Sequence, residues 1–237
     1  MNLPPLHHGI RLKRYKRFLS DVRLEDGTQV LAHCPNPGSM KTCQEAGWKV
    51  LLTHNTNPKR KLKWTWEIAF DGGDHPILIN TGRPNRIVEE AVAAGKIPKL
   101  AGYPVLKREV RYGNERSRID LLLEKPGQRC FVEIKSVTMA APDGGAMFPD
   151  SVTKRGTRHL RELILQKRAG DRAVLFFLLS RGGLASIRPA DEIDPEYGRT
   201  LREAIAAGVE VIAHRAIFSG GPADYRISVG PEVAVET

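Results

Sequence analysis

The sequence lacks an apolar run near the roughly 18 residues that cross a bilayer, and the start of the chain has no apolar stretch typical of a signal peptide. Cysteine is scarce: the three residues, Cys34, Cys43 and Cys130, include no Cys-x-x-Cys pair. An odd number of widely spaced cysteines excludes a disulfide framework and argues against a structural zinc site. These absences predict a cytoplasmic protein that does not associate with a membrane.

Acidic residues are also in deficit. The 237 residues include 37 Lys and Arg against 27 Asp and Glu, a net charge of +10. Such a charge attracts polyanions, and nucleic acid is the first candidate. The excess is densest in residues 1–82, where two basic clusters stand next to aromatic residues. We predict that the clusters contact nucleic acid through Arg14, Lys16, Arg17, Lys59, Arg60 and Lys61. The alternative is a solvated strand edge that discourages aggregation.

Residues 1–82 are rich in strand and turn signals. Alternating or apolar segments at 14–24, 29–33, 48–54, 63–70 and 77–80 predict five short strands, and Asp26-Gly27 predicts a hairpin turn. Five strands without a convincing helix favour a small β-barrel of the OB-fold type. For Trp64 and Trp66, packing in the barrel core is a more frequent role than stacking on bases.

Residues 83–237 predict an α/β domain. Helices are expected at 85–94, 158–168 and 196–207, the first two capped by Asn85 and Thr157. Strands are expected at 118–123, 130–135, 173–179 and 209–213. The segment 173–179 is apolar on both faces, as a covered central strand is. This order predicts a sheet flanked by helices and parallel in its later part, so the fold class is a two-domain α+β protein.

The most informative stretch is residues 117–138, where ionisable residues interrupt two apolar strands. Glu133 and Lys135 are two residues apart and therefore share a strand face. Asp120 lies in the preceding strand, and if the two strands pair, both carboxylates reach one point. Buried charge is costly unless it is paired or bound to a metal. We therefore predict that Asp120 and Glu133 bind Mg²⁺ or Mn²⁺ and that Lys135 steadies a scissile phosphate or the attacking hydroxide.

Other interpretations of this stretch remain open. Glu133 and Lys135 can simply lie on the solvated face of a hairpin, which is the common fate of so short a pattern. A third carboxylate is expected from the first helix, where Glu89 and Glu90 flank the apolar face and periodicity does not choose between them. Arg155 follows a loop rich in Gly and Pro that leads into a helix N-terminus, a place suited to a phosphate. His159 serves this site or is purely structural.

These residues resemble the PD-(D/E)xK nuclease superfamily, whose α-β-β-β-α-β core carries an Asp before one strand and Glu-x-Lys on the next. A closer resemblance covers nearly the whole chain: the sequence is similar to the sugar fermentation stimulation protein A family of bacteria and archaea. The blocks that carry it are Arg14 to Leu19, His33-Cys34-Pro35-Asn36 with Gly38 and Met40, Lys59-Arg60-Lys61, Thr65-Trp66-Glu67, Asn80-Thr81, Asn85-Arg86, Glu115 to Asp120, Val132 to Thr138, Phe148-Pro149-Asp150, Arg155-Gly156 and His159 to Leu163.

The resemblance implies an OB-fold domain, residues 1–82, followed by a PD-(D/E)xK nuclease-like domain, residues 83–237. Its Asn-Arg-Leu-x-x-Glu-Ala pattern places the third acid on Glu90. The family is described as DNA-binding, with a proposed role in sugar use. Two alternatives stay open: a DNA-binding regulator that retains a nuclease fold without catalysis, and a nuclease that acts on RNA.

Overall fold

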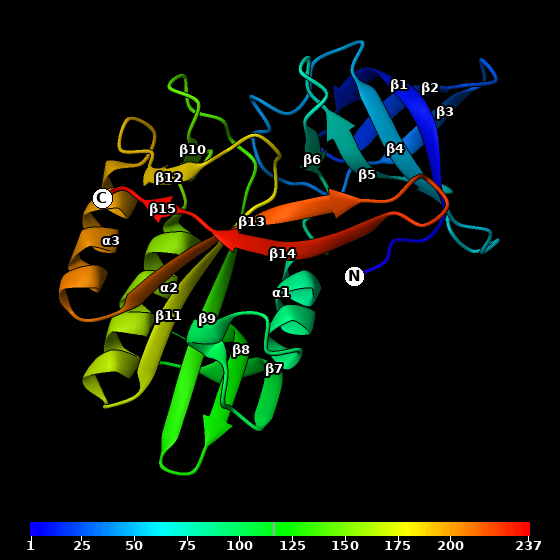
Figure 1. Ribbon diagram of the computed structural model, residues 1–237. Helices are drawn as coiled ribbons and strands as arrows, with labels where there is room; N and C mark the ends of the chain where they lie inside the picture. Colours follow the sequence, from blue (N-terminus) through cyan, green and yellow to red (C-terminus); the bar gives the residue numbers. More distant parts are fainter. Residues whose placement is uncertain (116) are drawn as a thin grey trace.

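The chain folds into a β-barrel followed by an α/β domain, seen in Figure 1 at the upper right and lower left. The computed structural model describes residues 1–115 and 117–237; Arg116, part of one block quoted above, lies outside the described residues. The barrel strands are β1 (Leu6–Tyr15), β2 (Leu19–Leu24), β3 (Gln29–His33), β4 (Lys49–His54), β5 (Trp64–Phe70) and β6 (Pro76–Leu78). Their order is β3-β2-β1-β4-β5-β6, and a parallel pairing of β3 with β5 closes five of them into a barrel.

One predicted strand of the barrel is wrong. Residues 14–24 do not form a single strand, because Lys16 and Arg17 turn the chain between β1 and β2 with φ of 48° and 60°. Two successive positive φ angles are typical of the tight turns that match strand twist. The signal was missed because Gly, Asn and Asp usually occupy such positions, whereas Lys and Arg rarely do.

The α/β domain contains α1 (Pro84–Ala93), the 3-10 turn η1 (Pro98–Leu100), α2 (Lys154–Arg168) and α3 (Pro195–Ala206). Its main sheet has the order β14-β13-β11-β9-β8-β7. The strands are β7 (Val105–Tyr112), β8 (Ser117–Lys125), β9 (Gln128–Val137), β11 (Arg172–Leu179), β13 (Glu210–Ser219) and β14 (Arg226–Glu232). A small sheet joins β10 (Ala146–Phe148), β12 (Ser186–Pro189) and β15 (Ala234–Val235). The parallel alignment of β9, β11 and β13 confirms the prediction for the later part of the sheet.

Two predicted helix caps are corrected by the structure. Thr153, not Thr157, caps α2, since its side chain accepts a hydrogen bond from the Gly156 amide. Helix α1 begins after Arg83 with no side-chain cap from the described residues, and Pro84 stands at its first position. A proline is suited to that position because its missing N–H would have no helical partner. Asn85 is thereby free for another role.

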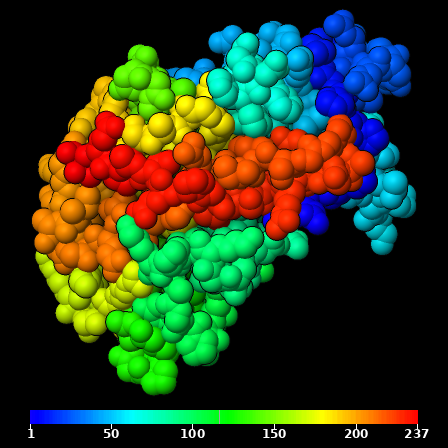
Figure 2. Space-filling model, in the orientation of Figure 1, coloured from blue at the N-terminus to red at the C-terminus, as the bar shows by residue number. Residues whose placement is uncertain are grey.

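The two domains share a hydrophobic core. Some residues of β4, β5 and β6 join the barrel core, and their neighbours Leu51, Ile68 and Leu78 join the cluster shared with the main sheet. These strands are thus buried on both faces, which explains their continuous apolar sequence. The hairpin of β13 and β14 runs across the junction, and Figure 2 shows it as an orange and red band beside the blue and cyan barrel.

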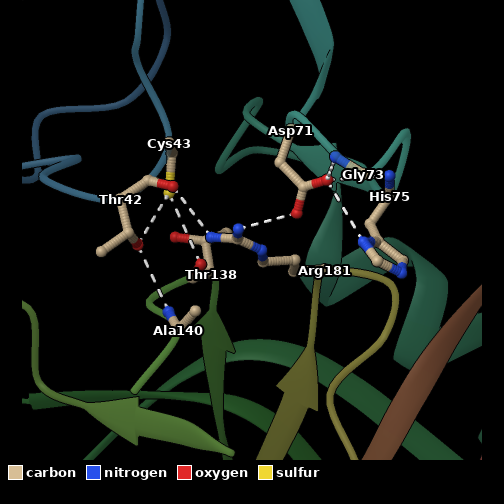
Figure 3. Close-up of polar contacts among 8 residues, drawn as sticks. All are labelled: Thr42, Cys43, Asp71, Gly73, His75, Thr138, Ala140 and Arg181. Atoms are coloured by element: carbon tan, nitrogen blue, oxygen red, sulfur yellow. Dashed lines mark hydrogen bonds and ion pairs between the residues drawn. The ribbon is translucent and has the colours of Figure 1, made fainter. Parts of the chain in front are cut away.

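Polar contacts also join the domains (Figure 3). The Arg181 guanidinium donates to the Asp71 carboxylate at 2.8 Å and to the Thr42 carbonyl at 2.8 Å. The Cys43 thiol donates to the Thr138 carbonyl, directly after β9. Burial alone would raise the pKa of Asp71, but backbone amides and Arg181 hold it below its ordinary value. The barrel loop that contains Thr42 is therefore fixed to the carboxyl end of β9.

Candidate carboxylate and lysine site

Three of the predicted site residues, Asp120, Glu133 and Lys135, lie where strands β8 and β9 diverge. The backbone pairing between these strands stops at Leu121 and Val132, one residue short of Asp120 and Glu133. In the gap, the Asp120 carboxylate accepts the Ile134 amide at 2.7 Å through Oδ2. A side chain thus takes the place of a backbone carbonyl, which satisfies an N–H that the strand geometry would leave without a partner.

Asp120 is also held by the first helix. Its Oδ1 accepts from the Asn85 side-chain amide at 2.7 Å. Burial and the nearby charge of Glu133 raise the pKa of Asp120 from 3.8 to about 6. The carboxylate is still ionised at neutral pH, but its charge is costly there, a condition that a bound cation would relieve.

Glu133 lies at the centre of the site and is 2% exposed. One carboxylate oxygen, Oε1, accepts from Lys135 Nζ at 2.7 Å and contacts His159 Nδ1 from helix α2. The other, Oε2, is buried without a hydrogen-bond partner among the residues that the structure describes. Burial alone would raise the pKa of Glu133, but Lys135 and His159 hold it below its ordinary value.

His159 connects Glu133 to a predicted phosphate contact. The Arg155 Nε donates to His159 Nε2 at 3.4 Å, while His159 Nδ1 contacts Glu133 Oε1 and lies 3.3 Å from Lys135 Nζ. Of the two roles that the sequence left open for His159, the structure places it within the carboxylate and lysine cluster.

Glu90 does not join this cluster. Its carboxylate is ion-paired with the Met1 amino group at 2.8 Å and with Arg86 at 3.0 Å. Glu89 lies one helical turn after Asn85 and pairs instead with Arg108 of β7 at 3.4 Å. In the described part of the chain, no three His, Cys, Asp or Glu side chains gather closely enough to hold a metal. The expectation that Glu90 is a third ligand is therefore corrected, since α1 turns that residue away from Asp120.

The residues still fit a divalent cation. Glu133 Oε2 is an available ligand without a partner among the described residues, and the pKa of Asp120 is raised by its burial and by the neighbouring charge of Glu133. Hard cations such as Mg²⁺ accept one or two carboxylates and keep several waters. Asp120 and Glu133 would hold such an ion together, with solvent completing its shell.

Sequence reasoning missed a basic cleft beside this site because it did not predict strand β7. Arg111 and Arg118 stand directly opposite each other on β7 and β8 and, with Tyr112 and Gly113, line a cleft of about 590 Å³. Two like charges at opposed positions destabilise a sheet, unless an anion lies between them. Burial and the charges of the neighbouring carboxylates raise the pKa of Tyr112, and its hydroxyl has no partner within the described residues.

The predicted nucleic-acid contacts divide into two groups. Arg14 is structural: it donates to the carbonyls of Arg17, Asn36 and Gly38. Arg60 is half-buried and donates to Thr65. The exposed members, which remain available to a polyanion, are Lys16, Arg17, Lys59, Lys61 and Arg155. Trp66 is fully buried, as expected for the core, while Trp64 is half-buried against the rings of His7 and His54.

The fold and the site define a class: a two-domain protein in which an OB-fold barrel precedes an α/β domain that carries an Asp and a Glu-x-Lys on adjacent strands. Comparison with known proteins makes this specific. The family model described as the SfsA N-terminal OB domain matches residues 12–79, and that of the sugar fermentation stimulation protein RE domain matches residues 82–221. The chain belongs to the sugar fermentation stimulation protein family.

Relatives and a solved structure agree with this assignment. The sugar fermentation stimulation protein homolog of Geobacter sulfurreducens is 52% identical over 229 residues and covers 96% of both chains. The homolog of Thioalkalivibrio sulfidiphilus is 52% identical over 219 residues and covers 92% of both. The structure of Pyrococcus furiosus SfsA in complex with Ca²⁺ superimposes with a TM-score of 0.88 at 30% identity, over 100% of this chain and 98% of that one. The described residues contain no helix long and apolar enough to span a membrane.

Proposed function

We propose that the protein binds DNA, largely independently of sequence, and hydrolyses its phosphodiester bonds at Asp120, Glu133 and Lys135 with Mg²⁺ or Mn²⁺. The observation that carries this proposal is Glu133: a nearly fully buried carboxylate with one oxygen unpartnered among the described residues, set between a lysine and a second carboxylate. A carboxylate is seldom buried in this way for stability alone, because its desolvation is costly.

Each residue has a separate task in this proposal. Asp120 and Glu133 hold the cation, which when bound polarises the phosphodiester and promotes ionisation of water. Lys135 supplies a positive charge on the same strand face and keeps Glu133 ionised. His159 fixes the Glu133 carboxylate through Oε1, which leaves Oε2 directed elsewhere. Arg111 and Arg118 offer contacts for the charged backbone.

Two further findings support the cation and the DNA. The Pyrococcus furiosus relative is described in complex with Ca²⁺, a cation that prefers oxygen ligands as Mg²⁺ does. The net charge of +10 and the exposed lysines suit a backbone-binding protein. Replacing both Lys59 and Lys61 with alanine should weaken DNA binding and lower the slope of log affinity against log salt by up to about 2.

The direct test is incubation of the purified protein with supercoiled plasmid and with single-stranded DNA, in Mg²⁺, Mn²⁺ or EDTA. Glu133→Gln and Lys135→Met should abolish cleavage, and Glu124→Gln, on the neighbouring strand and paired with Lys107, is the matched control. Metal-dependent nicking by the wild type and the control alone is the expected result. Cleavage by Glu133→Gln and Lys135→Met at the wild-type rate would exclude these residues as the catalytic site.

A second function is favoured by one observation. The described residues bring only two carboxylates together, and Glu90 is engaged elsewhere. A DNA-binding regulator of sugar-metabolism genes that retains the fold without catalysis has no need of a third ligand. This alternative predicts salt-sensitive retardation of DNA with no cleavage in any metal. Ribo- and deoxyribo-oligonucleotides of one sequence, compared in the same assays, distinguish an RNA substrate from DNA.

A further inference from the structure

A second cavity lies between the barrel and the α/β domain, at the carboxyl end of strand β9. It has a volume of about 200 Å³ and is lined by four segments that are distant in the sequence. The lining residues are Asn36, Pro37, Gly38, Thr81, Ser136, Thr138, Met139, Met147, Phe148 and Asp150. In open α/β sheets, ligands bind outside the carboxyl ends of the strands. Ser136 follows Lys135 on β9, with its side chain on the opposite face of the strand, so the cavity lies at the same carboxyl end of β9 as the proposed phosphodiesterase site.

The polar groups of this cavity are held in place before any ligand arrives. Asn36 is 6% exposed, and its Oδ1 accepts from the Gly38 amide at 2.9 Å. Its side-chain nitrogen, which must then face the other way, makes no hydrogen bond among the described residues. Arg14 fixes the same loop through the carbonyls of Asn36 and Gly38. The Asn36 amide is therefore held in one orientation at the wall of the cavity, and its nitrogen is a donor without a partner among the described residues.

Asp150 provides a hydrogen-bond acceptor. Its Oδ2 accepts from the Ser39 amide at 2.9 Å, the Ser39 hydroxyl at 3.1 Å and the Met40 amide at 3.3 Å. Its Oδ1 has only the adjacent Ser151 hydroxyl, at 3.4 Å, within the described residues. These contacts hold the barrel loop to the α/β domain and leave an acceptor available. Thr138 adds a hydroxyl that makes no hydrogen bond in the described part of the chain.

The walls are apolar. Met139 and Met147 are buried, and Phe148 packs its ring against Phe177 and Tyr197. The occupant must therefore have apolar faces together with a polar edge that both accepts and donates. A phosphate does not fit, because Asp150 is the one charged residue among the described residues of the lining and is acidic. A cavity of about 200 Å³ is smaller than the pockets of drug-sized ligands, so it suits a single flat ring.

We infer that this cavity binds one unpaired nucleobase of the strand whose backbone lies at the carboxylate and lysine site. This inference rests on the proposed function and gives the substrate class as DNA with at least one base outside a duplex. Enzymes that act on extruded bases hold them by stacking and by hydrogen bonds to the base edge. Asp150 favours bases with an exocyclic amino group, since carboxylates accept from such groups; thymine has none.

The test is a titration of the full-length protein with the four deoxynucleosides, in which binding is monitored by ligand-observed NMR. The probes carry no phosphate, and the titration needs no metal and no cleavage. Asn36→Asp keeps the acceptor for Gly38 and replaces the donating nitrogen with an acceptor oxygen, which also adds a negative charge. Asn57→Asp is the matched control, because Asn57 accepts the Lys59 amide in a similar turn outside the cavity. Loss of a hydrogen bond in the cavity should weaken binding at least about fivefold.

The expected result is that deoxyadenosine, deoxycytidine and deoxyguanosine bind the wild type and Asn57→Asp, more tightly than thymidine does, and that Asn36→Asp weakens them. If Asn36→Asp does not fold, Thr138→Val removes a polar group from the cavity without changing the loop. Absence of nucleoside binding to the wild type, or equal binding by all variants, would overturn the inference. Nucleoside binding without plasmid nicking would reject the nuclease while retaining the cavity, so the two failures are distinguishable.

Discussion

Replacing Asp120 with asparagine should stabilise the metal-free protein. The pKa of Asp120 is raised from 3.8 to about 6 by burial and by the charge of Glu133. A rise of about 2 units corresponds to about 3 kcal/mol of stability lost at pH 7, at 1.36 kcal/mol per unit. The hydrogen bonds survive the change: the new side-chain carbonyl can still accept the Ile134 amide, and Asn85 can turn its amide to accept from the new side-chain nitrogen.

The sign of the pH dependence follows from the same shift. A carboxyl whose folded pKa lies above its unfolded value destabilises the protein once it ionises. The penalty is complete above about pH 6, declines as the pH falls, and vanishes below about pH 4. The gain from Asp120→Asn should therefore be largest at neutral pH, up to about 3 kcal/mol, and should disappear near pH 4.

The assay is chemical unfolding in EDTA at several pH values between 4 and 8, with wild type and variant compared at each. Asp74→Asn is the control, because the Asp74 side chain is 71% exposed and its replacement should change stability by less than about 0.5 kcal/mol. Added Mg²⁺ should stabilise the wild type more than the variant. Two results would refute this reasoning: an Asp120→Asn variant less stable than the wild type at pH 7, or a difference in unfolding free energy between the two that does not change with pH. Either would mean that ionisation of Asp120 does not destabilise the metal-free protein.

Two further predictions concern the junction between the domains. Arg181→Met leaves the Asp71 carboxylate without its cation and should lower the free energy of unfolding by about 2–4 kcal/mol. Lys49→Met breaks an exposed ion pair and should lower it by less than about 1 kcal/mol. Similar losses in both variants would show that the Arg181–Asp71 pair does not stabilise the junction between the domains. Gly38→Ala places a Cβ 2.7 Å from Asp150 Oδ2. It should lower the free energy of unfolding by about 1–3 kcal/mol and weaken nucleoside binding. Gly72→Ala is the control, because a Cβ at Gly72 meets no atom within 4 Å, and it should leave nucleoside binding unchanged. Thermal unfolding and the nucleoside titration check both.

Most of the barrel could be predicted because its strands carry local signals. The segment 29–33 matches β3, and the Asp26-Gly27 turn occurs as expected, with Gly27 at φ 85°. Strand β7 was missed because its sequence, VLKREVRY, is largely polar and mostly exposed at the sheet edge. An edge strand depends on one neighbour and needs no apolar alternation on either face, so its sequence resembles that of a loop.

The candidate site could be predicted only in part. Alternation placed Glu133 and Lys135 on one face, and their ion pair at 2.7 Å agrees with that. Glu90 could not be assigned from periodicity, because two adjacent glutamates flank the apolar face of one helix. Asn85 was read as a cap, yet it donates to Asp120, 35 residues away. A capping rule considers only neighbouring residues, so it does not predict a hydrogen bond to a residue so far along the chain.

The sequence by itself determined that a basic chain with a barrel and an α/β domain would carry Asp120, Glu133 and Lys135 on strands, because strand periodicity and burial are properties of short segments. Only the tertiary structure decided which groups meet them. The packing of α2 on β9 brings His159 to Glu133, α1 brings Asn85 rather than Glu90 to the site, and the shared core brings the barrel loop to the end of β9. Such contacts depend on how elements pack after they form, which no local pattern encodes.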